Sequence, residues 1–381
     1  MRICVLRATA LAIALSSACA WSQPEASHAE TNGASASARP GDIAARSARF
    51  DGIMQRHTIP GAQLIHSHDG VYDAYAYGVM SHRTSREVTD QTVFQAASLS
   101  KVVGAYITLR LVDQGSIDLD TPLWDYWHSN RTEDNAAARK ITARMVLNHT
   151  TGLPNWQISP SNPAIDDTPL VSQFEPGKRF SYSGEGFYLL QRTLEHVTGL
   201  GWDALAQREV FARFDMPSSH YLTDPAFDAR NAAGHEKDGS TRPDRVFAWE
   251  NTAWTLVTNA HDYNHFIQSA LYRGEGLEPS TRDMMFARSS DADDLSIPSA
   301  ADPFIDWGLG VAIQSANGRK LVWHWGDNPG FKALFMLDPG TGESIVLFTN
   351  SENGLETYRE VLELFLGEGD YPAIDWARAQ S

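Results

Sequence analysis

Cysteine is nearly absent from this chain of 381 residues, and both examples, Cys4 and Cys19, lie within the first twenty positions. That segment begins with two arginines, continues as an apolar run through Leu15 and ends in Ala18-Cys19-Ala20. This pattern is typical of a secretory signal peptide, and cleavage is expected after Ala20. The mature chain would then contain no thiol, which excludes a disulfide, a cysteine nucleophile and a thiolate-bound metal.

Two alternatives to cleavage fit this leader less well. An N-terminal membrane anchor would need a longer apolar run to cross a bilayer. A lipoprotein acylated at Cys19 would need an aliphatic residue before it, and Ser16-Ser17-Ala18 has none. We therefore expect a periplasmic or secreted protein, with the lipoprotein as the minority option.

Positive charge is scarce: 31 Lys and Arg stand against 47 Asp and Glu, so the net charge is −16. Removing the two arginines of the leader takes it to −18. Such an acidic chain repels polyanions and has no basic run, which argues against nucleic-acid binding. The sequence also lacks an internal repeat and a second long apolar run, so no stable membrane span is expected after signal cleavage.

Secondary structure is expected only after a flexible lead-in. Residues 21–41 are rich in Ala, Ser, Gly and Pro, whereas 42–57 repeat large apolar residues at helical spacing. Strands at 62–66 and 71–77 flank Ser67-His68-Asp69-Gly70, which predicts a hairpin with Asp-Gly at its turn. Further helices are predicted at 101–114, 142–149, 184–198, 202–211 and 259–272, and later strands at 308–314, 321–324, 333–337 and 344–349, with turns at Asn317-Gly318 and Pro339-Gly340. A helix at 355–366 is expected to close the chain.

This order predicts an α+β domain over residues 42–381. One antiparallel sheet would be built from both chain ends, about 42–97 and 306–381, with terminal helices on one face. A largely helical subdomain, about 98–305, would be inserted between them.

The segment Ser98-Leu99-Ser100-Lys101 carries the first chemical signal. Positions i and i+3 share a helix face, so the Lys101 amine can reach the Ser98 hydroxyl. Burial lowers the pKa of a lysine, and its neutral amine can then take the serine proton. Two later segments offer partners: Tyr182 in a small-residue loop that enters a helix, and His324 near the end of a predicted strand.

Taken in order, Ser98-Leu99-Ser100-Lys101, Tyr182-Ser183-Gly184 and His324-Trp325-Gly326 resemble the serine β-lactamase, penicillin-binding protein and esterase superfamily. Members carry S-x-x-K, then Y-x-N or S-x-N, then K-T-G or H-x-G. The class C β-lactamase-like branch is most similar, and the likeness covers about residues 42 to 365. It extends to segments 94–97, 147–153, 174–177, 253–256 and 307–310.

The resemblance implies a role for each residue. Ser98 would be the acylated nucleophile, with Lys101 as base and Tyr182 carrying the proton to the leaving group. The backbone N–H groups of Ser98 and Asp327 would form the oxyanion hole, and His324 would stand beside Tyr182 where many relatives have lysine. Gly184, Trp325 and Gly326 are further candidates for substrate contact.

Two departures from the family pattern bear on the substrate. Gly184 replaces an asparagine that holds the substrate amide, and neutral His324 replaces a lysine that meets a substrate carboxylate. Both changes argue against efficient β-lactam hydrolysis, and H-x-G members of the family are associated with esterases and D-amino-acid peptidases. The resemblance therefore implies an acyl-serine hydrolase of that type, acting on a small or short-peptide ester or amide, with cell-wall fragments among the candidate substrates.

Other interpretations stay open. A β-lactamase or DD-carboxypeptidase proper is one alternative, and a non-catalytic penicillin- or cell-wall-binding protein is another. No cofactor is expected, because His66-Ser67-His68-Asp69 has no third ligand at a useful spacing and His261 and His265 lack the glutamate of H-E-x-x-H. His149 is expected to be structural, and strand alternation places Trp323 and Trp325 opposite His324. The physiological substrate depends on how 155–175 and 285–305 fold over the cleft.

Overall fold

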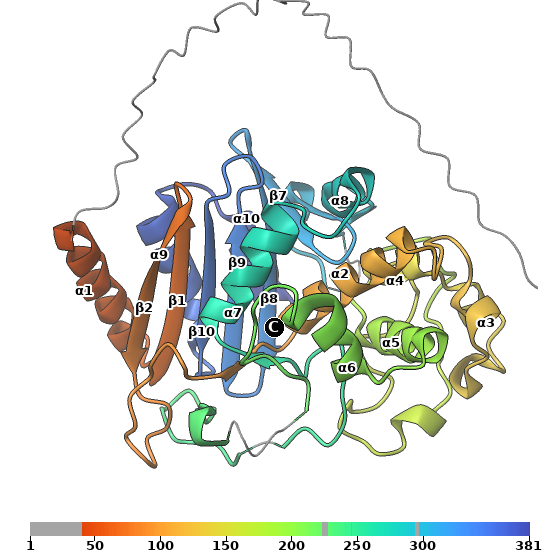
Figure 1. The fold of residues 1–381 in the computed structure, drawn as a ribbon, viewed down its shortest axis with the longest axis horizontal. Helices are drawn as coiled ribbons and strands as arrows, with labels where there is room; N and C mark the ends of the chain where they lie inside the picture. The colour runs from red at the N-terminus through yellow and green to blue at the C-terminus, as the bar shows by residue number, and fades with distance from the viewer. Residues whose placement is uncertain (1–39, 223–227, 245, 294–296) are drawn as a thin grey trace, which may run out of the picture. The chain divides into compact units, whose positions relative to one another are not determined.

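One antiparallel sheet joins the two ends of the described chain (Figure 1). The computed structural model describes residues 40–222, 228–244, 246–293 and 297–381, so the predicted signal peptide and nearly all of the predicted lead-in lie outside it. The strand order is β2-β1-β10-β9-β8-β7-β6-β5. The strands are β1 (Gly61–His68), β2 (Val71–Gly78), β5 (Ser290–Asp291), β6 (Ile305–Trp307), β7 (Ala312–Ala316), β8 (Arg319–Asn328), β9 (Phe331–Leu337) and β10 (Ser344–Thr349).

Side chains alternate along each strand, and the central strands β1, β10, β9 and β8 are buried on both faces, whereas the edge strand β2 is largely exposed. Leu321, Leu334 and Ile345 pack with the terminal helices α1 (Pro40–Arg56), α9 (Tyr358–Leu366) and α10 (Pro372–Ala379). Their neighbours in sequence, such as Val322 and Val346, face the second core beneath the helical part of the chain. The predicted α+β fold, with a sheet built from both chain ends, is confirmed.

The middle of the chain is mostly helical and covers the other face of the sheet, where α7 contacts β1 and β10 and α2 contacts β8 and β9. Its α-helices are α2 (Leu99–Asp113), α3 (Leu123–Tyr126), α4 (Ala143–Leu147), α5 (Gly184–Thr198), α6 (Trp202–Ala206), α7 (Ala260–Phe266) and α8 (Pro279–Phe286). Single π-turns extend α6 and α7, at Gln207–Phe211 and Ile267–Tyr272. Short 3₁₀ turns lie at Asn130–Thr132, Ala138–Lys140, Ile165–Asp167, Asp228–Arg230, Asp302–Phe304 and Gly354–Thr357, and β3 (Phe94–Gln95) pairs with β4 (Val257–Thr258) outside the large sheet.

Three predicted elements differ from the structure, and one of them is the strand expected at 321–324, which runs over Arg319–Asn328 as β8 and so includes Asp327. The strand expected at 308–314 begins only at Ala312, because Gly308 and Gly310 cross tightly packed neighbours: a Cβ would lie 2.2 Å from the Met285 carbonyl oxygen and 2.1 Å from the Ala105 Cβ, respectively. The helix at 355–366 was expected to close the chain, and this is wrong, because α10 follows it.

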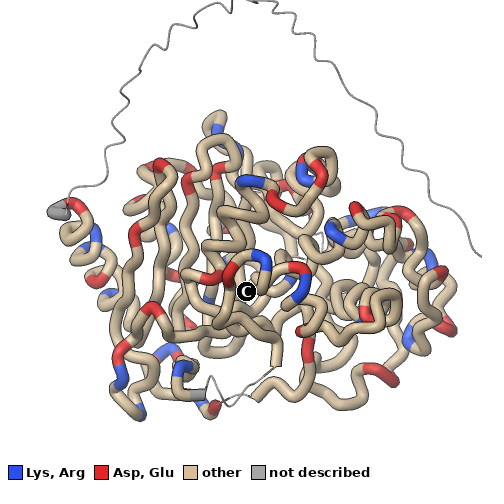
Figure 2. Tube along the Cα trace, viewed as in Figure 1, with Lys and Arg blue, Asp and Glu red and all other residues tan. Residues whose placement is uncertain are grey.

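Charge is dispersed over the fold. Figure 2 shows acidic and basic residues interspersed along the trace rather than gathered in one block. In the described part of the chain, every helix is too short or too polar to cross a membrane.

Candidate active site

Ser98 lies where the chain turns from β3 into the buried helix α2. Ala97, just before it, adopts a left-handed conformation with φ 49°, and Ser98 is the N-cap of the helix. One turn later, Lys101 Nζ donates to Ser98 Oγ at 3.1 Å and to the Ala253 carbonyl oxygen at 2.8 Å. The predicted juxtaposition of hydroxyl and amine is therefore present.

The surroundings of Lys101 favour its uncharged form. Lys101 is 2% exposed, and its amine contacts a hydroxyl and a backbone carbonyl oxygen rather than a carboxylate. The amine lies 4.9 Å from the centroid of the Tyr182 ring and 5.8 Å from that of Phe187. Desolvation by burial lowers the pKa of Lys101 to about 7, so a large fraction is a neutral base at physiological pH.

Tyr182 presents its ring to this pair, and its hydroxyl lies near that of Ser98. Burial raises the pKa of the phenol, and the nearby Ser98 hydroxyl opposes this rise only in part. Tyr182 is therefore a neutral phenol in this state. His149 stacks on it at 4.4 Å between centroids and accepts a hydrogen bond from the Ser183 backbone N–H at 3.0 Å, as expected of a structural histidine.

His324 is fully buried on β8 and carries no charge. Its Nδ1 lies 2.7 Å from the Trp325 carbonyl oxygen, which can only accept, so Nδ1 holds the proton and Nε2 keeps a free lone pair. Desolvation, together with the Lys101 charge, lowers the pKa of His324 to about 3. Its ring centroid lies 6.2 Å from that of Tyr182, and its Nε2 makes no hydrogen bond with a described residue.

Strand β8 brings a backbone amide beside Ser98. The two-residue turn Pro329-Gly330 makes Asn328 and Phe331 a hydrogen-bonded pair of the antiparallel ladder. The next pair, Asp327 and Lys332, is therefore a non-hydrogen-bonded pair, and the Asp327 N–H points away from β9. Strand β7 lies on the side of β8 opposite β9, but its pairing with β8 reaches only to Trp323. Strand β7 therefore does not pair with the Asp327 N–H.

Gly326 allows this close passage. A Cβ at position 326 would lie 2.4 Å from the Ala96 carbonyl oxygen, so only glycine lets β8 pass against the segment that leads to Ser98. The Asp327 carboxylate meets Lys332 Nζ at 2.9 Å. The Ser98 N–H makes no hydrogen bond with a described residue.

A cavity of about 360 Å³ opens in front of these groups. Of the predicted site residues, Ser98, Tyr182, Trp325 and Asp327 line it, whereas Lys101 and His324 lie behind its wall. Gly184 and Gly326 do not line it. Its other lining residues are Pro154, Asn155, Gln173, Ser181, Ile297, Gln380 and Ser381.

Asn155, which lines the cavity, and its neighbour Trp156 were not identified from the sequence. A Cβ at Gly184 would lie 2.4 Å from Trp156 Cζ2, so the indole fills the space that a side chain at 184 would take. Beside it, Asn155 accepts a hydrogen bond from the Gly184 backbone N–H through Oδ1 at 2.9 Å. The only indication in the sequence was that both residues come shortly after the segment 147–153, which resembles the family.

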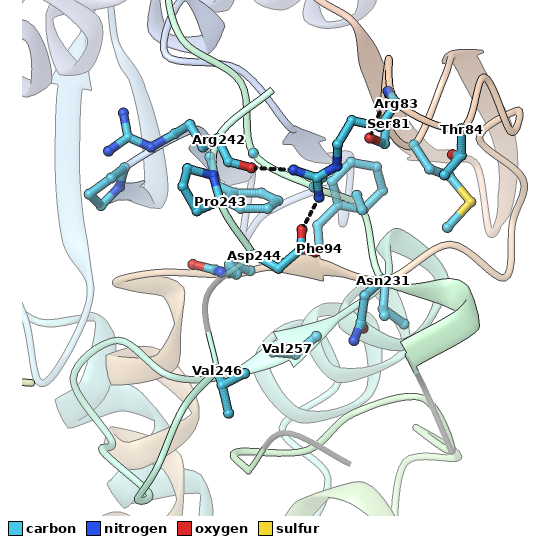
Figure 3. A pocket seen from close by; sticks show the side chains of 18 of the residues that line it. Ser81, Arg83, Thr84, Phe94, Asn231, Arg242, Pro243, Asp244, Val246 and Val257 are labelled. Atoms are coloured by element: carbon cyan, nitrogen blue, oxygen red, sulfur yellow. Dashed lines mark hydrogen bonds and ion pairs between the residues drawn. The ribbon is translucent and has the colours of Figure 1, made fainter. Parts of the chain in front are cut away.

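A second, larger cavity of about 710 Å³ shares no lining residue with the first (Figure 3). Its Gln95 precedes Ser98 by three positions and its Pro329 follows Asp327 by two, so the two cavities are lined by neighbouring segments. Arg83 spans it, donating to the Arg242 carbonyl oxygen and pairing with Asp244. No group of the Ser98 cluster lines this cavity, and we place the chemistry in the smaller one.

Comparisons with known proteins identify the family of this chain. The family model described as Beta-lactamase matches residues 47–365. Penicillin-binding protein 4 of Amycolatopsis lactamdurans is 26% identical over 349 residues, which cover 86% of this chain and 91% of that protein.

Solved structures share the fold. SurE superposes with a TM-score of 0.73 at 25% identity, covering 87% of this chain and 78% of SurE. SurE with D-Leu gives 0.69 at 23% identity over the same shares. A class C beta-lactamase gives a TM-score of 0.72 at 17% identity, covering 87% of this chain and 98% of that chain.

Proposed function

Because the chain belongs to the beta-lactamase family of serine hydrolases, we propose that it is an exported enzyme that cleaves an ester or amide through an acyl-enzyme on Ser98. The observation that carries this proposal is the buried amine of Lys101, 3.1 Å from Ser98 Oγ and with its pKa lowered to about 7. A serine alcohol beside a neutral amine is an activated nucleophile.

In the proposed reaction, Ser98 Oγ attacks the substrate carbonyl carbon and its proton passes to Lys101. The oxygen that becomes negative is held by the Ser98 and Asp327 N–H groups, and the N-terminus of α2 adds a favourable dipole. The proton then moves through the Tyr182 phenol to the leaving group, whose bond to the carbonyl carbon breaks. Water reverses these transfers and releases the acid.

The lining of the smaller cavity supports a neutral or cationic substrate rather than an anionic β-lactam. Among the described residues its lining contains no lysine or arginine, and its one acidic side chain is that of Asp327, which pairs with Lys332. His324 adds no charge, and Trp156 fills the place beside Gly184. We therefore favour an esterase or a peptidase for D-amino-acid amides with a free ammonium group, a class also suggested by SurE with D-Leu.

The test compares wild type with Ser98→Ala on a fluorophosphonate probe, p-nitrophenyl butyrate, a D-aminoacyl p-nitroanilide and nitrocefin. We expect Ser98-dependent labelling, turnover of the ester or the anilide, and slow nitrocefin hydrolysis. Labelling without turnover would instead support the binding-protein alternative. Rapid Ser98-dependent nitrocefin hydrolysis would make the protein a β-lactamase proper, and unlabelled wild type would contradict an active serine.

A further inference from the structure

Two histidines of β1 and an aspartate of β2 meet on the face of the sheet that packs against α1 and α9. His66 and His68 are two positions apart, so their side chains share that face, and their rings stack at 4.7 Å. The hairpin register pairs His66 with Asp73, whose Oδ2 lies 3.1 Å from His68 Nε2. Asp73 is the third ligand that linear spacing alone did not indicate.

The donor atoms of these residues are close together, and one of the four imidazole nitrogens has no partner among the described residues. One atom from each of His66, His68 and Asp73 lies within 4.8 Å of the others. His66 is 2% exposed, and its Nδ1 has no hydrogen-bond partner among the described residues. A buried imidazole nitrogen without a partner is costly, and a bound ion would satisfy it.

We propose that His66, His68 and Asp73 bind a divalent transition-metal ion, with Zn²⁺ as the representative. Two imidazoles and one carboxylate, with no thiolate, suit Zn²⁺ better than Ca²⁺ or Mg²⁺, which prefer six or more oxygen ligands. Tetrahedral ligand atoms are about 3.4 Å apart, so small side-chain rotations would close the 4.8 Å arrangement. Water would fill the fourth position.

The charges around this site leave it available. Arg46 reaches Asp73 only at 3.9 Å, whereas Arg319 holds Glu343 at 2.9 Å and so keeps that carboxylate, 3.4 Å from His66 Nε2, as a neighbour rather than a ligand. Strands β10 and β9 separate β1 from β8, so the ion would pin the β1–β2 hairpin and take no part in chemistry at Ser98.

The test uses untagged full-length protein, with Zn²⁺ titrated by calorimetry and Co²⁺ followed by its visible absorption. Wild type should bind one Zn²⁺, show a Co²⁺ band and gain a few degrees in melting temperature with Zn²⁺. His68→Ala and Asp73→Asn should each weaken Zn²⁺ binding by tenfold or more and remove the Co²⁺ band. Circular dichroism checks that both variants fold.

Asp69, in the turn of the same hairpin, lies 3.6 Å from His68 Nδ1, so Asp69→Asn should weaken Zn²⁺ binding less than Asp73→Asn does. The matched control is the double variant His261→Ala/His265→Ala, which should not change binding. Equal loss in Asp69→Asn would place the ion at the turn, and unchanged binding in Asp73→Asn would remove the carboxylate from the site. Either result, or no stoichiometric binding by wild type, overturns the proposal. Serine labelling should persist after chelation by EDTA.

Discussion

At the scale of single residues, the protonation state of Lys101 determines the pH dependence of the proposed reaction. Only its neutral amine accepts the Ser98 proton, and its pKa is lowered to about 7. The rate of acylation should therefore rise with pH through about 7 and level off above pH 8. His324, whose pKa is about 3, is neutral over this whole range.

Stopped-flow measurement of acylation by p-nitrophenyl butyrate between pH 5 and 9 follows this rise of the rate with pH. His324→Asn serves as the comparison, because it should keep an apparent pKa of about 7 whatever its effect on the plateau. If the apparent pKa of the acylation rate shifts in His324→Asn, the assignment of Lys101 as the base is contradicted.

Lys101 should also destabilise the fold. In the unfolded chain it holds its proton up to the ordinary lysine pKa of 10.5, whereas the folded pKa is about 7. The unfolded state therefore binds more protons between these values, and the cost to folding reaches about 5 kcal/mol below pH 7 and fades as pH rises toward 10.5. We expect Lys101→Met to abolish labelling and to stabilise the protein at pH 6 by a few kcal/mol, less the lost hydrogen bond to Ala253.

Urea unfolding at pH 6 and pH 9 tests this, with Lys101→Arg as the variant that retains the charge. A Lys101→Met protein that is equally stable at both pH values relative to wild type would show that the amine is not desolvated.

The contact between Trp156 and Gly184 should couple their substitutions. Gly184→Asn alone forces a side chain into the indole, 2.4 Å from its Cζ2, and should cost about 1–3 kcal/mol. Adding Trp156→Ala makes room, so the double variant should recover stability relative to the sum of the singles and hydrolyse nitrocefin faster than either. Additive effects in thermal unfolding would show that the two sites do not compete for space.

At the scale of elements, the passage of β8 past the Ala96 carbonyl positions the Asp327 amide. Gly326→Ala should push the strand away from Ser98 and lower kcat by about 10²-fold, because an oxyanion donor displaced by about 1 Å loses most of its effect. Gly52→Ala, inside α1, meets only Arg56 at 3.5 Å and should leave kcat unchanged. Steady-state hydrolysis of the ester distinguishes the two, and equal kcat values would contradict the role of Gly326.

Elements with local signals were predictable from the sequence. The bounds of α5 match the prediction because Ser183 caps its start and Gly199, with φ 69°, ends it. The hairpin turn is likewise set by Asp69 and Gly70, both with positive φ. By contrast, α10 is only eight residues long, and its stability comes from burying Trp376 rather than from propensity, so the sequence did not reveal it.

The site was predictable where motifs define it and not where distant segments meet. Ser98, Lys101, Tyr182 and His324 were identified from three short motifs, and the structure brings them together. The filling of the space beside Gly184 depends on how a loop folds back, which no local pattern specifies. The pairing of His66 with Asp73 could have been predicted from the sequence, because a two-residue turn at 69–70 fixes the register of the hairpin.

At the scale of the whole molecule, the two cores share the sheet, so the fold should unfold as one unit. Trp376 of α10 is fully buried against Trp325, at 5.3 Å between centroids, and against Phe180, two positions before Tyr182. Trp376→Ala should cost about 3–5 kcal/mol and move the loss of helix signal and the loss of Ser98 labelling to lower urea together.

Circular dichroism and fluorophosphonate labelling, read in the same urea series, measure both transitions. Trp124→Ala, where a partly buried ring stacks on His128, is the control and should shift neither by much. Labelling lost well before the helix signal would mean that the site melts independently of the sheet.

The position of Gln380 and Ser381 has a practical consequence. Both line the smaller cavity, and the end of the chain is marked near the centre of the view in Figure 1. An affinity handle or fusion partner joined after Ser381 would begin beside this cavity, and under the proposed function the activity measured on such a fusion should be lower than that of the free protein. Material for kinetics should carry its handle elsewhere or have it excised.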